Sequence, residues 1–383
     1  MYRIRINWLG LLVCAQFAFS CGTGGGSASE AIVEPEEPPS ASATVLPDSC
    51  PSGSGNFPNT TCVVLRIESE DTGALDVEVR IIEPAASTPL IGTVLLSSGG
   101  PGELFYSETA GGDLLITELL AAGHRVVDRR WSAGWFSTGE GVKQQSVRYA
   151  TLLNWVHENV HTTGTFCATG NSAGAAEIAY ALTTWDLSSI LDRVVLTSGP
   201  PFSRLDFACD IPSSPEWLSI CPANVPAGVM ECGVPECTTE NQVACQQVVV
   251  DPEPGELEAN SLLHPGAILD YPTTDFIMLI GALDCTNAVP LSLHFFNAVT
   301  SFASLAFIPN TPHLLSTSVE GRSAISDALV GVLPTAEPVP ATQFQSHYSY
   351  SYEPSANSAA LRGVVYDPVR GLVTRQVIVY ESR

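Results

Sequence analysis

The sequence predicts an α/β fold with a mostly parallel central sheet, helices on both faces and a Cys-rich cap insertion. Short apolar runs typical of strands alternate with longer segments whose apolar residues recur at helical spacing. Elements that alternate in this way favour parallel strands joined by crossover helices. The chain has 383 residues, of which 45% are apolar, and this is enough for one large core.

The expected sheet starts with an antiparallel hairpin over residues 62–84. The later strands are more continuously apolar, as expected where both faces are covered. They are predicted in IGTVLLSS, HRVVDRRW, TFCATG, LDRVVLTSG, DFIMLIGALD and LAFIPNTPH. Helices are predicted around residues 112–122, in QQSVRYATLLNWVHENV, directly after TFCATGNS, in AVPLSLHFFNAVTSF and in SVEGRSAISDALVGVL.

One long segment breaks this alternation and sets the domain boundaries. Residues from about 200 to 272 are rich in proline and cysteine and are far longer than a usual connection. They are predicted to form a cap inserted into a main domain that spans residues 49–333. The C-terminal extension, residues 334–383, contains RGVVYDPVRGLVTRQVIVY, which predicts a β-hairpin.

The N-terminus predicts export. Residues 1–21 combine two early arginines with a short apolar stretch, which is typical of a secretion signal. The junction AFSC resembles a bacterial lipobox, so Cys21 is expected to be lipid-modified and to anchor the protein in the cell envelope. Ordinary cleavage after Ser20, giving a secreted or periplasmic protein, is the alternative. Residues 22–48 are rich in Gly, Ser, Pro and Glu, and predict a disordered tether.

Export allows the cysteines to be interpreted as disulfides. Cys167 lies in an apolar run and is expected to be a buried free thiol. Cys50 and Cys62 form a predicted local pair, and six others are expected to link the segment 209–245 to itself and to Cys285. A zinc site in that segment is the alternative, but it contains no histidine, so no metal is expected.

The charge balance argues against nucleic acid as a partner. The chain has 16 Lys and Arg against 40 Asp and Glu, which gives a formal net charge of −24 at pH 7. A surface of this kind repels phosphate backbones and anionic membranes. The simplest interpretation of the charge is solubility outside the cell.

The segment TFCATGNSAGAAEIAYAL predicts a strand, a tight turn and a helix, with Ser172 in the turn. The pattern G-x-S-x-G between a strand and a helix is the nucleophile elbow. The turn forces the serine into a strained conformation and raises its hydroxyl above the sheet. Larger side chains at Gly170 and Gly174 would collide with neighbouring backbone. Ser172 is therefore the predicted nucleophile.

A serine nucleophile needs a base, which is oriented in turn by a carboxylate. Asp284 ends the predicted strand DFIMLIGALD, and His313 follows the predicted strand LAFIPNTPH. They are the predicted acid and base. Other candidates for the acid are Asp206, Asp270 and Asp275. The other histidines are less suitably placed; they are His124, His157, His161, His264, His294 and His347.

The attacked carbonyl develops an oxyanion, which requires two preorganised donors. The backbone N–H of Ala173, directly after the nucleophile, is one candidate. The loop SSGGPGE after the strand IGTVLLSS is expected to supply the other, through Gly100. Glycines in that loop allow a close approach of the backbone.

Together these residues resemble the α/β-hydrolase superfamily, over roughly residues 62–333. The resemblance implies serine hydrolysis through an acyl-enzyme, with no cofactor. The loop GGPG is similar to the oxyanion loop of proline iminopeptidases and related secreted aminopeptidases, in which histidine commonly precedes the glycines; here Ser98 takes that place. The elbow GNSAG is nearer to that of many esterases.

The segment DRRWSAGWF places arginines and tryptophans beside the expected site. One interpretation is that Trp131 forms an aromatic wall and that Arg129 or Arg130 grips a substrate carboxylate. The alternative is a surface pair of an arginine with Asp128, beside packed tryptophans.

These observations favour an exported serine hydrolase that cleaves carboxylic esters. An aminopeptidase of the proline iminopeptidase type is the alternative, and a non-catalytic surface lipoprotein is a third. The expected partners are a small ester or a short peptide, and a membrane only through acylated Cys21.

Overall fold

The computed structural model describes most of the predicted main domain and parts of both flanking segments. The described residues are 40–47, 57–136, 141–205, 254–284, 286, 288–331, 349–353, 358–362, 365–367, 371–373 and 377–379. The predicted secretion signal with Cys21, most of the predicted cap and most cysteines therefore lie outside the described residues. No helix in the described part of the chain is long and apolar enough to cross a membrane.

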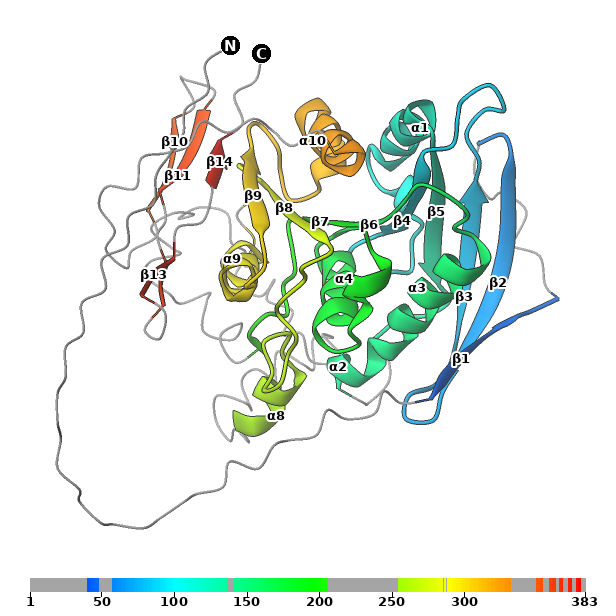
Figure 1. Cartoon of the computed structure of the whole chain (residues 1–383), viewed down its shortest axis with the longest axis horizontal. Coiled ribbons are helices and arrows are strands. Elements are labelled where there is room, and N and C mark those ends of the chain that lie inside the picture. Colours follow the sequence, from blue (N-terminus) through cyan, green and yellow to red (C-terminus); the bar gives the residue numbers. More distant parts are fainter. Residues whose placement is uncertain are drawn as a thin grey trace, which may run out of the picture. The chain divides into compact units, whose positions relative to one another are not determined.

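The described residues form one ten-stranded sheet with the order β1-β2-β3-β5-β4-β6-β7-β8-β9-β14 (Figure 1). The pairs β1–β2, β2–β3 and β3–β5 are antiparallel. Every further pair in this order, from β5–β4 to β9–β14, is parallel. The predicted mostly parallel sheet is confirmed. The strands are β1 Ala41–Val45, β2 Thr60–Ser69, β3 Gly73–Ile82, β4 Gly92–Ser97, β5 His124–Trp131, β6 Thr165–Asn171, β7 Arg193–Thr197, β8 Asp275–Gly281, β9 Ala303–Ile308 and β14 Val377–Val379.

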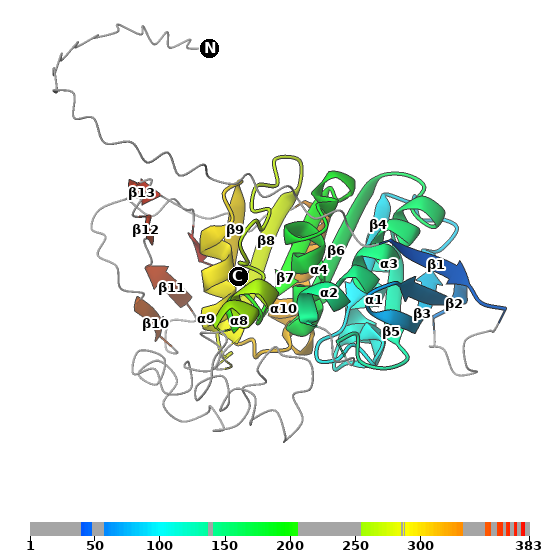
Figure 2. The same ribbon diagram turned by 90° about the horizontal axis from the view of Figure 1, so that it is seen from below.

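Helices cover both faces of this sheet. α1 and α10 lie on one face, and α3, α4 and α9 lie on the other, as the view in Figure 2 shows. The α-helices are α1 Gly112–Ala122, α2 Val142–Gln145, α3 Val147–Asn159, α4 Ala173–Thr183, α8 Pro254–Asn260, α9 Ala288–Ala298 and α10 Val319–Val330. Short 3₁₀ turns are η1 Tyr106–Glu108, η2 Leu187–Ile190 and η4 Leu315–Thr317.

The strand β4 shows how the two faces divide the core. All six of its residues are buried. Leu95 packs in the apolar cluster that contains α3 and α4 side chains, whereas Val94 and Leu96 pack in the cluster that contains α1 and α10 side chains. Alternate residues of a strand point to opposite faces. A continuous apolar run therefore fills both layers, as predicted.

The antiparallel edge differs from the prediction in one respect. The hairpin expected over residues 62–84 is present as β2 and β3. Residues 22–48 were expected to be an unstructured tether, but Ala41–Val45 form β1 and pair with β2 in the register Ala41↔Ser69 to Val45↔Leu65. Since the outer edge of β2 offers unpaired backbone groups, even a short polar segment can add a strand there.

The cysteine predictions are partly tested. Cys167 is a free and fully buried thiol, as expected, and burial raises its pKa to about 11. Cys62 is disulfide-bonded. Its predicted partner Cys50 lies outside the described residues, as do the cysteines of the segment 209–245 and Cys285. Those pairings stay predictions.

Short additional strands lie in the C-terminal extension. β10 Ser349–Glu353 pairs antiparallel with β11 Ser358–Arg362, and β12 Val365–Asp367 pairs antiparallel with β13 Gly371–Val373. β14 then extends the main sheet beside β9.

Candidate active site

The backbone at Ser172 has the geometry of a nucleophile elbow. Ser172 lies between β6 and α4 and has φ 55° and ψ −121°, outside the helical and extended regions. A residue with a side chain rarely adopts such a conformation, and it persists only where the surroundings impose it. One constraint is the hydrogen bond of 2.9 Å from Ser172 N to Thr197 O on the neighbouring strand β7.

The two flanking glycines are required because of close backbone approaches. A Cβ added to Gly170 would lie 2.5 Å from the carbonyl oxygen of Gly174. A Cβ added to Gly174 would lie 2.5 Å from the carbonyl oxygen of Ser98 and would also collide with that of Ser97. The steric reason that the sequence gives for these glycines is therefore visible in the structure.

Asp284 and His313 meet at the same edge of the sheet. Asp284 Oδ2 lies 2.8 Å from His313 Nδ1, and the Asp284 side chain is fully buried, whereas that of His313 is 31% exposed. An ionised carboxylate only accepts hydrogen bonds, so Nδ1 carries the proton. The second ring nitrogen, Nε2, is then available as a base.

Thr286 adds two contacts that the sequence interpretation missed. Its backbone N–H donates to Asp284 Oδ1 at 2.9 Å, and its Oγ1 lies 3.1 Å from His313 Nδ1. An aspartate that accepts from the backbone two residues later is a local turn motif. The order Asp-x-Thr was the available sequence signal. Both carboxylate oxygens of Asp284 are thus held.

Neighbouring strands bring Ser172 and this acid–base pair to one edge. Ser172 follows β6, Asp284 follows β8 and His313 follows β9, and these parallel strands stand in the order β6-β7-β8-β9. Leu283 N donates to Thr311 O at 2.9 Å, which fixes the acid loop against the histidine loop. No hydrogen bond joins the Ser172 hydroxyl to His313 within the described residues.

The loop after β4 runs directly against the elbow. A Cβ added to Gly99 would lie 3.0 Å from Asn171 O and 3.3 Å from Ser172 Cβ. Gly100 has φ +61°, with open space beside it. Ala173 is the first residue of α4, so its N–H has no acceptor within the helix. The two predicted oxyanion donors therefore lie in segments that are adjacent.

Burial contradicts the predicted roles of Arg129 as a grip for a substrate carboxylate and of Trp131 as part of an aromatic wall. Both side chains are buried, with exposed fractions of 0% and 1%. Arg129 forms a fully buried ion pair with Glu177 of α4, and Trp131 Nε1 donates to the same carboxylate at 2.6 Å. Burial raises the pKa of Glu177 to about 7, although the Arg129 guanidinium acts in the opposite direction.

Arg130 also has protein partners instead of a free guanidinium. It contacts Glu78 at 2.8 Å and Glu108 at 3.5 Å. Asp128, the alternative partner named from the sequence, is buried and accepts hydrogen bonds from Tyr106 N and Ser107 N. The tryptophans Trp131 and Trp135 are packed in the core, as the second interpretation expected, but no arginine of this segment pairs with Asp128 at the surface. The residues of DRRW alternate between two sides of β5, and carboxylates lie on both sides.

The other described histidines lie elsewhere in the fold. His124 begins β5, at the edge opposite to the elbow, and is buried. His157 and His161 stack on each other at 5.7 Å between ring centroids and lie against Phe166, which is near the start of β6. His264 Nε2 lies 3.2 Å from Thr184 Oγ1, just after α4.

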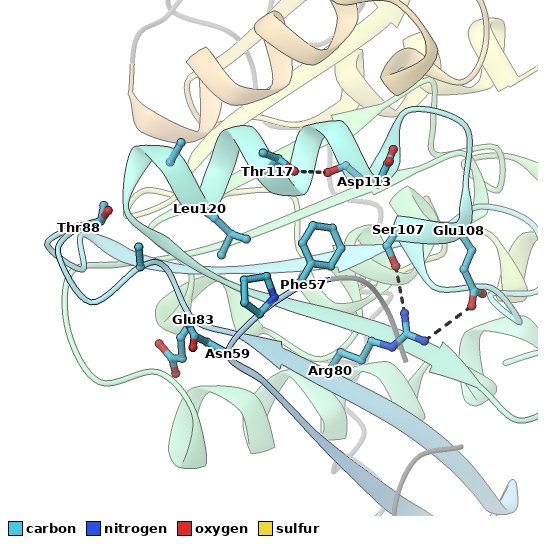
Figure 3. A pocket seen from close by; sticks show the side chains of 13 residues that line it. Phe57, Asn59, Arg80, Glu83, Thr88, Ser107, Glu108, Asp113, Thr117 and Leu120 are labelled. Atoms are coloured by element: carbon cyan, nitrogen blue, oxygen red, sulfur yellow. Dashed lines mark hydrogen bonds and ion pairs between the residues drawn. The ribbon is translucent and has the colours of Figure 1, made fainter. Parts of the chain in front are cut away.

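A cavity of about 660 Å³ lies between α1 and β3, and no residue of the predicted triad lines it. Figure 3 shows Arg80 at one end, reaching Ser107 and Glu108. Its walls also include Phe57 and Leu120. This cavity is separate from the serine and histidine loops, and the candidate chemistry does not use it.

No family model matches the sequence, and a comparison with curated proteins gives no match. The chain is similar in structure to Est1E from Butyrivibrio proteoclasticus, with 13% identity over 67% of this chain and 94% of that chain and a TM-score of 0.43. It is also similar to the esterase Pf2001 from Pyrococcus furiosus, with 15% identity over 72% of this chain and 96% of that chain and a TM-score of 0.41. A third similar structure is XC6422 from Xanthomonas campestris, described as an α/β serine hydrolase without lid, with 15% identity over 79% and 100% of the two chains and a TM-score of 0.40.

The sheet order, its antiparallel start and the strand–serine–helix elbow define an α/β-hydrolase fold. The predicted nucleophile, acid and base occur along the chain in the order that is usual in this fold; they are Ser172, Asp284 and His313.

Proposed function

We propose that this protein is a serine hydrolase that cleaves carboxylic esters through an acyl-enzyme. The observation that carries the proposal is the strained backbone of Ser172 at the sheet edge where Asp284 and His313 are hydrogen-bonded. Backbone strain at a residue of this kind is typical of sites where a side chain must be held in a particular direction.

In the proposed reaction, His313 Nε2 accepts the proton of the Ser172 hydroxyl as the oxygen attacks the ester carbonyl. Asp284 keeps the ring proton on Nδ1 and stabilises the imidazolium that forms. The same imidazolium then protonates the leaving alcohol. Water, activated by the neutral ring, hydrolyses the acyl-enzyme in the reverse sequence of proton transfers.

The oxyanion of each tetrahedral intermediate would be stabilised by the backbone N–H groups of Gly100 and Ala173. Two observations support this assignment. The positive φ of Gly100 lets the loop turn sharply beside the elbow, and the N–H of Ala173 begins a helix. The partial positive charge at a helix N-terminus favours an oxyanion there.

An aminopeptidase of the proline iminopeptidase type is the second candidate. The loop GGPG, which resembles the loop of those enzymes, favours it. Such an enzyme needs a carboxylate to hold the free amine of its substrate. A panel of short acyl esters and aminoacyl amides, compared by kcat/KM, separates the two candidates.

We also propose that the enzyme is exported and anchored through a lipid on Cys21. The support is the sequence pattern of residues 1–21 alone. Metabolic labelling with a fatty-acid probe tests it, because Cys21→Ser removes the label if Cys21 is the acceptor. Persistent labelling of that variant contradicts the anchor.

A fluorophosphonate probe tests the catalytic assignment. We expect the wild type to be labelled and to hydrolyse a short acyl ester, and Ser172→Ala to do neither. Ser87→Ala is the matched control, because Ser87 is exposed in a turn after β3. Equal labelling of the wild type and Ser172→Ala would contradict the proposal.

A further inference from the structure

Arg129 and Glu177 form a fully buried ion pair that the proposed chemistry does not use directly. Arg129 comes from β5 and Glu177 from α4, and both side chains are 0% exposed. Trp131 Nε1 donates to Glu177 Oε1 at 2.6 Å, so three side chains from two elements meet here. Two desolvated charges are costly to bury, and such a pair is therefore unexpected in a purely apolar layer.

The partners of Arg129 connect this pair to the loop after β4. Arg129 donates to the carbonyl oxygen of Gly102 at 2.9 Å and to that of Ser98 at 3.1 Å. Ser98 directly precedes the GGPG segment, and Gly102 is its last residue. A planar guanidinium has five donors in a fixed fork, so it can bind both carbonyls and a carboxylate at once.

Backbone donors from β5 and the following turn hold the same loop. Trp131 N donates to Gly102 O at 2.9 Å, and Trp135 N donates to Pro101 O at 3.1 Å. The carbonyl groups of Ser98, Pro101 and Gly102 are thus turned toward the interior. This arrangement leaves the Gly100 N–H unbonded within the described part of the chain.

The other end of the pair is attached to the nucleophile helix. Glu177 lies on α4, whose first residue, Ala173, follows the elbow. The ion pair therefore joins the segment that carries one proposed oxyanion donor to the helix that carries the other. Oxyanion donors act only when their positions are fixed to within fractions of an ångström.

We propose that Arg129 and Glu177 are positioning residues that hold the GGPG loop in register with the nucleophile helix. This inference rests on the proposed serine hydrolase function. Arg129 contacts neither substrate nor reacting atoms; it acts through the loop carbonyls. Loosening the pair should weaken stabilisation of the tetrahedral intermediate and leave substrate binding nearly unchanged.

Arg129→Lys is the first test. Lysine keeps the positive charge beside Glu177, but one ammonium group cannot reach both loop carbonyls and the carboxylate in the same geometry. We expect kcat to fall about 10-fold to 100-fold with KM changed less than about threefold. Rates are expressed per active site, counted by complete fluorophosphonate labelling, so that a misfolded fraction does not contribute.

Arg130→Lys is the matched control. Arg130 is the next residue of β5. Its guanidinium pairs with Glu78 and Glu108 and lies over the ring of Phe105, and no contact to the GGPG segment is among the interactions of the described residues. Its kcat per active site should equal that of the wild type. Glu177→Gln is a second variant, which keeps an acceptor for Trp131 and Arg129 but removes the charge; it should also lower kcat selectively.

The outcomes are distinct. A selective loss of kcat in Arg129→Lys and Glu177→Gln supports the positioning role. If both variants are labelled by the probe and have the wild-type kcat per active site, the positioning role is wrong, whereas the proposed hydrolase function stands. If the wild type itself neither reacts with the probe nor hydrolyses esters, the proposed function fails and this inference fails with it.

Discussion

The buried carboxylate of Asp284 lies 2.8 Å from Nδ1 of the half-exposed His313 ring. This contact determines that Nδ1 carries the ring proton and leaves Nε2 as the unprotonated nitrogen. The backbone N–H of Thr286 holds the other oxygen of the same carboxylate. The acid therefore has little freedom to turn away from the histidine.

Asp284→Asn should lower kcat by about two to four orders of magnitude, because the amide favours the wrong ring tautomer. Steady-state kinetics on a short acyl ester measures the effect. Asp275→Asn is the control, because Asp275 begins β8, the strand that Asp284 follows, and its side chain is 60% exposed and pairs with Arg193. An Asp284→Asn variant with more than about a tenth of the wild-type kcat would refute the role of the acid.

Gly174→Ala should destabilise the fold by about 3 kcal/mol, because the new methyl group meets two backbone carbonyls that cannot move aside. Chemical denaturation measures the free energy of unfolding. Gly255→Ala in α8 is the matched control, as a Cβ there meets nothing within 4 Å. It should leave stability unchanged or raise it slightly. Equal effects of the two substitutions would show that the close approach at Gly174 is absent.

His124 should make the fold sensitive to mild acid. Burial, together with nearby Arg193, lowers the pKa of His124 to about 4, from 6.5. The unfolded chain then binds a proton at this residue before the folded chain does, so stability is present above pH 6.5 and is lost as the pH falls toward 4. The loss attributable to His124 is about 3 kcal/mol.

The comparison for His124 is between the wild type and His124→Phe, each unfolded with denaturant at pH 7 and pH 4. The wild type should lose about 3 kcal/mol more than the variant over this range. Within the described residues, both ring nitrogens of His124 are without hydrogen-bond partners, so the substitution breaks no such contact there. Identical acid sensitivity of the two proteins would disprove the assignment.

Asp128→Ala should destabilise the fold by about 3 kcal/mol. The buried carboxylate accepts hydrogen bonds from Tyr106 N at 2.7 Å and Ser107 N at 3.1 Å, and its removal leaves both donors without an acceptor. Thermal or denaturant unfolding measures the change. Asp113→Ala, at an exposed position of the first turn of α1, should change stability by less than about 1 kcal/mol. If Asp128→Ala leaves the stability of the fold unchanged, the backbone N–H groups of Tyr106 and Ser107 find other acceptors in the variant.

Local patterns in the sequence predicted much of the fold and the elbow. The continuous apolar run of β4 predicts a strand covered on both faces, since a half-exposed strand would alternate. The run before Gly170, the Ala-rich helix after Ser172 and the small residues between them predict a tight turn. These signals depend only on neighbouring residues, and the structure contains the corresponding elements.

Three features were beyond local patterns. Arg129 looked available to a substrate, but Glu177 occupies the space opposite it, on a helix far along the chain. The segment Ala41–Val45 has the composition of a tether, yet it completes the open edge of β2. The hydroxyl of Thr286 contacts Nδ1 of His313 only because His313, which is distant in the sequence, lies beside Asp284.

The amino-acid sequence by itself determined which segments become strands and helices and where the chain must turn sharply, because propensity, apolar period and glycine sterics act over a few residues. Tertiary structure alone decided that Glu177 is the partner of Arg129 and that Ala41–Val45 cover the open edge of β2. Such pairings depend on how distant segments pack, and a linear order of residues does not specify the space between them.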